Sequence, residues 1–262
     1  MSWWRRKRKP EPDPAAEAEA ARIAQALEGG PLGGRPASAA RLPGTGELVV
    51  HVPIEPAEVL DAWRAACAVS GSTGRQPLAV MSYGDDLPDG SIYTDGGVVA
   101  AAADRAREMT REQALAVLGA TGREMEELDA SFGLADDDDG SHLGWFAPDR
   151  HPAAIAFLPT TAAEEAVAYA GLFPWDAVEE LAALVTLARG WHERYGAELV
   201  AGWGTMLQFV VERPPADVEA ARELTSEQLV VASDTIMLPG VLPDAHARAL
   251  VGRRTWFLHS RP

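Results

Sequence analysis

Residues 47–81 constrain the fold most, because two apolar runs flank a segment with helical spacing. The runs "LVVHV" (48–52) and "PLAV" (77–80) have the length and composition of short strands. Between them Pro56 is a favourable first helical residue, and the apolar residues recur at helical spacing: Val59, Leu60, Trp63 and Cys67. We therefore expect a right-handed strand–helix–strand unit with parallel strands.

The clearest amphipathic helix covers residues 177–195. Its apolar stripe recurs at steps of three and four residues: Leu181, Leu184, Val185, Ala188, Trp191 and Tyr195. Gly196 ends it, and "AELVAGW" and "MLQFVVE" indicate two strands turning near Gly204. With the buried strand "AAIAFLP" (153–159), these segments predict a mixed α/β fold of the α+β kind, in which helices flank a mixed sheet.

Local turn and capping signals give further expectations. The segment "IYTDGGVV" (92–99) is a plausible hairpin, because Gly96 and Gly97 tolerate positive φ. A shorter helical piece is expected at 123–128. Three helix starts are expected at capping residues: Thr110 with Gln113, Thr161 with Glu164, and Asp176 ahead of the amphipathic helix.

The N-terminal region has a different composition from the rest. Residues 1–46 are rich in proline and glycine, and their one periodic segment is alanine-rich with few large apolar anchors. We expect a mobile basic tail with one marginal helix, followed by a globular domain over 47–262. Trp3 and Trp4 beside five cations give only weak attraction to an anionic membrane. Because no apolar run of about 18 residues is present, we expect a cytoplasmic protein.

Charge and cysteine content narrow the function classes. The net charge is −16, and residues 1–10 carry five cations and no acid, so the remainder stands at −16 − 5 = −21. An acidic body repels nucleic acid, and it suits solubility, cation binding or a basic protein partner. Cys67 is the single cysteine, which excludes an intramolecular disulfide and a cysteine-based zinc cluster.

Sequence motifs for common chemistries are missing or incomplete. His192 and Glu193 match the first two residues of the zinc-binding His-Glu-x-x-His helix motif. The motif requires a second histidine four residues after the first, and that position is Gly196. We interpret this pair as the solvated end of a helix. The glycine clusters lack the lysine of a phosphate-binding loop, and no serine occupies a Gly-x-Ser-x-Gly elbow.

The acidic run Asp136–Asp139 resembles a metal site only superficially. With Gly140 as the sixth loop residue, a helix–loop–helix calcium site would place Ala135 and Phe146 where oxygen ligands are required. An irregular site with nearby histidines is the alternative to a solvated acidic loop. We assign no metal and no cofactor.

The C-terminal third resembles a known bacterial family. The segments "GWHERYGAELV", "ERPPADVEAARELTSEQL", "ASD" and "RRTWF" together are similar to domain-of-unknown-function family 4253 (DUF4253), over about residues 154–262. The resemblance implies a fold unit and a bacterial origin, and it implies no reaction. The recurring residues of the family match here at Trp175, Trp191, Tyr195, Gly196, Glu198, Pro214, Pro215, Glu227, Gln228, Asp234 and Trp256.

Several polar positions depart from that family's pattern. Gln208 stands where an acid is common, Ala232 and Ser233 replace the usual Cys-Pro before Asp234, and residues 259–262 replace an aromatic, acidic end. A site built on those polar groups would be altered in this chain.

The expected function is non-enzymatic binding, in an immunity or regulatory role against a basic protein partner. The alternative is a hydrolase-like enzyme with its site in a cleft between the two halves. Its candidate acids and bases are Asp176, His192, Glu227 and Asp234. Three of these within hydrogen-bonding reach around one pocket would favour the enzyme, and scattered positions would favour binding.

Overall fold

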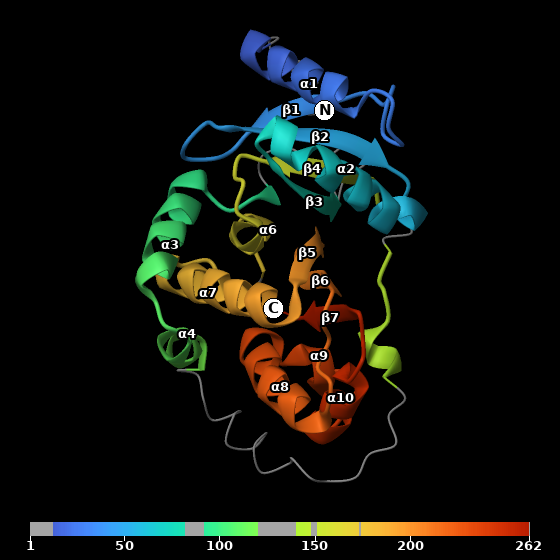
Figure 1. Cartoon of the computed structure of the whole chain (residues 1–262). Coiled ribbons are helices and arrows are strands. Elements are labelled where there is room, and N and C mark those ends of the chain that lie inside the picture. Colours follow the sequence, from blue (N-terminus) through green and yellow to red (C-terminus); the bar gives the residue numbers. More distant parts are fainter. Residues whose placement is uncertain (1–12, 82–91, 120–139, 148–150, 173, 262) are drawn as a thin grey trace, which may run out of the picture.

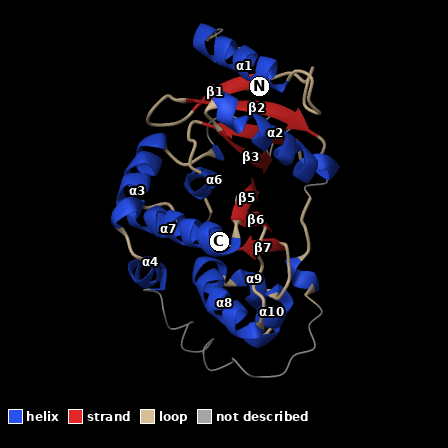
Figure 2. Cartoon of the chain, viewed as in Figure 1, coloured by secondary structure: helices blue, strands red, loops and turns tan. Residues whose placement is uncertain are grey.

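The computed structural model describes residues 13–81, 92–119, 140–147, 151–172 and 174–261. These residues form one seven-stranded mixed sheet, and helices cover both of its faces (Figures 1 and 2). The strands are β1 (Ser38–Arg41), β2 (Leu48–Ile54), β3 (Gln76–Met81), β4 (Ala153–Leu158), β5 (Ala197–Gly202), β6 (Met206–Val211) and β7 (Thr255–His259). The α/β fold class is confirmed.

The strand–helix–strand unit is present, but its two strands are not neighbours. The sheet order is β1-β2-β4-β3-β5-β6-β7, so β4 lies between β2 and β3 and is antiparallel to both. β2 and β3 therefore run in the same direction, as expected, without pairing. All six residues of β4 are buried, as a central strand requires. Local periodicity cannot show that β4, which begins about 70 residues after the end of β3, lies between β2 and β3 in the sheet.

Two groups of helices cover the sheet. One face packs against α1 (Pro14–Leu27) and α2 (Val59–Thr73), which follows the short helix η1 (Pro56–Glu58). The other face packs against α3 (Gly96–Glu108), α4 (Arg111–Leu118), α6 (Ala166–Ala170), α7 (Val178–Tyr195) and α8 (Val218–Ala232). The remaining short helices are η4 (Ser141–Leu143), η5 (Ala163–Glu165), α9 (Asp234–Met237) and α10 (Pro243–Leu250).

The predicted phase of α7 is confirmed. Trp191 and Tyr195 are 2% and 8% exposed, whereas His192 and Glu193 are exposed to solvent. Gly196 ends the helix in the left-handed region at φ +60, where a side chain would be strained. The expected hairpin of β5 and β6 turns at Gly204, whose φ is +77.

The hairpin expected at residues 92–99 is wrong. Asp95 instead caps α3, and its carboxylate accepts the backbone N–H groups of Gly97 at 2.8 Å and Val98 at 3.3 Å. Gly96 is the first residue of α3. Glycine is needed at this position because a Cβ there would lie 2.4 Å from Thr45 Oγ1. An Asp-Gly-Gly sequence suits a helix start as well as a turn, and tertiary packing decides between them.

One of the three capping predictions is confirmed. Thr110 and Gln113 form the reciprocal capping box of α4. Asp176 does not cap α7, because Glu180 reaches back and accepts the N–H of Ala177 at 3.2 Å.

The third prediction, a helix cap at Thr161, is wrong by one residue, because Thr160 makes the capping hydrogen bond. Thr160 Oγ1 accepts the N–H of Ala162 at 3.1 Å, ahead of η5 and α6. The helical segment itself begins close to the place that the sequence indicates.

The prediction of a mobile tail is wrong for residues 13–46. α1 buries Ile23 completely and Leu27 to 4% exposure, and Leu32 after it is 2% exposed. β1 pairs with β2 and forms one edge of the sheet. The alanines of α1 reduce the number of large anchors, but they also let the helix lie close to the sheet. Packed structure therefore begins before residue 47.

Some expectations fall outside the described residues. These are the basic segment with Trp3 and Trp4, the helical piece at 123–128 and the acidic run Asp136–Asp139. Among the described residues, no helix has both the length and the apolar character needed to cross a membrane.

Candidate functional site

The four acid and base candidates lie at separate places in the fold. Asp176 is exposed just before α7, and His192 is exposed in its last turn, with Nδ1 3.3 Å from the Ala197 carbonyl oxygen. Asp234 begins α9, and its Oδ2 accepts the backbone N–H of Arg261 at 2.7 Å. Within the described ranges, no hydrogen bond or ion pair joins any two of Asp176, His192, Glu227 and Asp234.

Glu227 is the one candidate with a buried, multiply bonded carboxylate. It lies on α8, is 0% exposed and accepts Trp191 Nε1–H at 2.6 Å. Arg111 from α4 and Arg194 from α7 donate to the same carboxylate, each at 2.5 Å. A buried carboxylate is tolerated only with such compensation, and these donors occupy both of its oxygens. The arrangement joins three helices and leaves the carboxylate poorly placed to accept a proton from a substrate.

The aromatic packing beside this carboxylate explains several family-matching residues. Trp191 packs edge-on against Trp256, with ring centroids 6.2 Å apart, and against Phe209 at 5.7 Å. Tyr195 packs against Trp256 at 5.5 Å. Edge-to-face contacts of this kind add to the stability gained from burial. Trp191 therefore connects the aromatic core to Glu227.

A second polar cluster, which the sequence reasoning missed, surrounds His246 on α10. His246 is fully buried, with Nδ1 2.9 Å from His142 Nε2 and Nε2 3.1 Å from Gln228 Oε1. Burial, and to a lesser extent His142 and Arg253, lowers the pKa of His246 to about 3. A neutral His246 that donates from Nε2 to Gln228 can accept a hydrogen bond at Nδ1 from the Nε2–H of His142.

Two further features bear on chemistry. Burial, followed by the charge of Glu198, raises the pKa of the Cys67 thiol to about 12, so the reactive thiolate is scarce near neutral pH. In the part of the chain that the structure describes, no group of three or more His, Cys, Asp or Glu side chains is placed to hold a metal ion.

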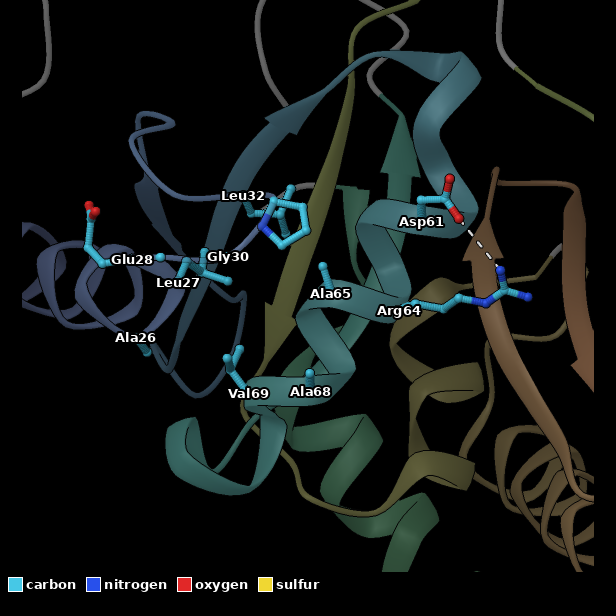
Figure 3. Close-up of a pocket in the computed structure, with 12 residues that line it drawn as sticks. Ala26, Leu27, Glu28, Gly30, Leu32, Asp61, Arg64, Ala65, Ala68 and Val69 are labelled. Atoms are coloured by element: carbon cyan, nitrogen blue, oxygen red, sulfur yellow. Dashed lines mark ion pairs between the residues drawn. The ribbon is translucent and has the colours of Figure 1, made fainter.

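Concave surfaces lie away from the acid and base candidates. A groove of about 550 Å³ separates the end of α1 from α2, where Leu27, Gly30 and Ala65 face it (Figure 3). A crevice of about 270 Å³ lies at the ends of β3 and β5. His192 lines only a cavity of about 10 Å³, roughly the room for one water molecule. None of the four candidates lines either larger concavity.

These features define a mixed α/β protein in which the polar clusters around Glu227 and His246 join helices. Its C-terminal part, residues 154–259, matches the family model described as "Domain of unknown function (DUF4253)". No curated protein and no solved structure matches the chain significantly. The matched part includes Trp191, Glu227, Gln228 and Trp256, so both polar clusters involve this domain.

The matched domain shares its sheet with the preceding chain. β4 to β7 fall almost entirely within residues 154–259, whereas β1, β2 and β3 precede them. β3 lies between β4 and β5 and pairs with both. The residues before the match are therefore a structural part of the same sheet.

Proposed function

We propose that this chain is a non-enzymatic binding protein of the bacterial cytoplasm, and that its acidic surface engages a basic protein partner in an immunity or regulatory role. The observation that carries the proposal is the surplus of acidic side chains over basic ones. The chain has 39 acidic side chains against 23 lysines and arginines. The single cysteine and the resemblance to a bacterial family support the compartment.

The acidic surface is best defined where α4 meets α8. Glu219, Glu223 and Glu227 follow one another at four-residue steps and so lie along one stripe of α8. Arg111 pairs with Glu223 at 2.8 Å and with Glu227, whereas Glu112 and Glu219 are exposed and have no ion pair among the described residues. Arginines therefore neutralise the buried Glu227 and the exposed Glu223, whereas Glu112 and Glu219 stay negative.

The sequence that follows α4 has a net charge of the same sign. The chain between Gly119 and Gly140 contains eight acidic residues and one arginine, a net charge of 1 − 8 = −7. Its two attachment points, after α4 and before η4, lie at the end of the molecule formed by α8 and α10 (Figure 1). A field of one sign steers an oppositely charged partner and raises its association rate.

The hydrolase-like alternative has less support. It needs acids and bases that converge on a pocket, and the four candidates occupy separate positions. Glu227, the best buried of them, has its carboxylate oxygens occupied by Trp191, Arg111 and Arg194.

The test is a pair of charge reversals with equal net change. The partner is isolated by affinity capture with the full chain, purified, and titrated calorimetrically. We expect Glu112→Lys with Glu219→Lys to weaken binding at least about tenfold, because the reversal lies on the proposed surface.

The matched control is Glu17→Lys with Glu28→Lys on and just after α1, at the opposite end of the molecule (Figure 1). Both side chains are exposed and unpaired in the described structure, and we expect a change of less than about threefold. Equal losses from both pairs would show that only net charge matters. Turnover of the captured molecule would favour the enzyme.

A further inference from the structure

The direction of the strands creates a distinctive position in the sheet. Among the neighbouring pairs of the described sheet, β3 and β5 alone run parallel, with Val80 opposite Gly202. Their carboxyl ends therefore lie side by side. Along the chain, β3 is followed by β4, which pairs with β3 on the side away from β5. β5 is followed by β6, which lies on the side of β5 away from β3. Open α/β sheets bind ligands in the crevice outside the carboxyl ends at such a divergence.

The crevice of about 270 Å³ lies at this position. Its walls come from the ends of β3 and β5, the segment at Tyr93 and the end of α6. The wall toward α6 consists of small residues: Ala170, Gly171, Gly202 and Gly204. A Cβ added at Gly202 would lie 2.8 Å from the Cβ of Ala170, so the packing of α6 on β5 requires glycine there.

Among the described lining residues the remaining wall is apolar, apart from Tyr93, and its other polar groups belong to the backbone. Val80, Met81 and Ile92 supply aliphatic surface. Gly171 and Gly204 adopt φ +62 and +77, and for neither backbone N–H does the described structure contain a hydrogen-bond partner. Such donors suit an oxygen acceptor.

Tyr93 keeps its wall uncharged. Its hydroxyl lies 2.6 Å from His51 Nε2, and burial raises the pKa of Tyr93 well above its usual value of 10. The described lining residues thus offer no fixed charge to pair with a charged ligand. Small-molecule pockets are generally apolar with a few polar groups that fix orientation.

The volume limits the size of the ligand. An apolar cavity of about 150 Å³ accommodates benzene, and this crevice is nearly twice as large. We propose that the crevice at the carboxyl ends of β3 and β5 binds a compact, uncharged, largely apolar molecule of about ten to twelve non-hydrogen atoms that carries a carbonyl oxygen.

The test uses 1-indanone as the probe and indane, which lacks the carbonyl, as its counterpart. Methyl resonances of ¹³C-labelled methionines report the position, because Met81 lines the crevice and Met237 is 54% exposed elsewhere. We expect saturable shifts at Met81 and none at Met237. Indane should bind about three- to tenfold more weakly, because it cannot accept a hydrogen bond.

Two matched substitutions test the location. Ala170→Met extends a flexible side chain into the crevice and should weaken 1-indanone binding more than tenfold. Ala65→Met makes the same change in the groove between α1 and α2 and should leave binding within twofold (Figure 3). If Ala170→Met lowers the melting temperature markedly, Ile92→Phe at the partly exposed wall replaces it.

The proposal fails if 1-indanone gives no saturable shift at Met81 in the wild-type chain. It also fails if a folded crevice variant binds as the wild type does, or if Ala65→Met abolishes binding. These readouts do not depend on the acidic surface at α4 and α8, nor on whether that surface binds a basic partner.

Discussion

Glu227 illustrates how a candidate catalytic residue can serve the fold. The sequence identifies it as an acid near the C-terminal motifs, but it cannot identify donors 116 and 33 residues away, at Arg111 and Arg194. The residue type was therefore predictable, and its role was not. Asp234 and Asp176 are candidates on the same grounds. They lie apart from Glu227 because each is found at the start of a different helix.

We expect Glu227→Gln to destabilise the fold by about 1–3 kcal/mol. The amide keeps the shape of the side chain but removes the buried charge that Arg111 and Arg194 share, and leaves them the exposed Glu223 as a charged acceptor. The cost stays below that of breaking a fully buried pair, because both arginines reach solvent. Urea unfolding measures it, with Glu219→Gln as the exposed control at under about 0.5 kcal/mol. Equal stability of wild type and Glu227→Gln would contradict the structural role.

Trp191→Ala should cost about 3–5 kcal/mol of unfolding free energy. The change removes a buried indole, its aromatic contacts and one donor to Glu227. His192→Ala, at the next position, should cost less than about 1 kcal/mol because His192 is exposed. Chemical denaturation of both variants compares the two costs directly, and similar values would oppose the helix phase described above.

His246 should make the fold sensitive to mild acid. The pKa of His246 is about 3 in the folded chain, below its usual value of 6.5, so the unfolded state binds the proton first. The stabilisation is fully present above pH 6.5 and is lost as the pH falls toward 3, with a slope of at most ~1.4 kcal/mol per pH unit. In urea unfolding at several pH values, His246→Gln should show a flatter dependence. An unchanged slope would contradict this assignment.

At the level of elements, periodicity predicted most helices and strands, and its errors have identifiable causes. α7 and the β5–β6 hairpin have long, strongly patterned sequences, and both are confirmed. α1 was underestimated because alanine carries little hydrophobic signal, although its close packing needs small residues. The position of β4 depends on pairing with distant strands, which no local pattern encodes.

The N-terminal elements give a direct test of that correction. Deleting residues 1–12 keeps every α1 and β1 contact described above, so the melting temperature should change little. Deleting residues 1–45 removes the edge strand β1 and four buried large side chains: Ile23, Leu27, Leu32 and Leu42. At roughly 1.5–3 kcal/mol for each side chain, that loss should lower the melting temperature sharply or prevent folding. Equal melting of both truncated chains would restore the tail interpretation.

At the level of the whole molecule, the sheet unites the C-terminal family domain with the residues before it. β3 separates β4 from β5, so residues 154–259 alone lack a strand from the middle of their sheet. The sequence resemblance located the domain correctly, but it did not reveal this dependence. The candidate crevice depends on the same arrangement, because its walls come from both parts of the chain.

The acidic surplus is a property of the whole molecule, and binding driven by it should respond to ionic strength. Exposed charges are screened within about 8 Å at physiological salt and within about 3 Å at 1 M. A partner held by apolar contact or by the crevice would not show the same response. Salt dependence therefore distinguishes electrostatic recognition of a basic partner from the other modes of binding open to this fold.

The most direct test of the proposed function is the dissociation constant of the purified partner complex, measured calorimetrically from 50 to 500 mM sodium chloride. We expect the constant to rise at least about tenfold across this range. We also expect a weaker salt dependence for Glu112→Lys with Glu219→Lys than for Glu17→Lys with Glu28→Lys. A dissociation constant that stays the same across the range would contradict the proposed function.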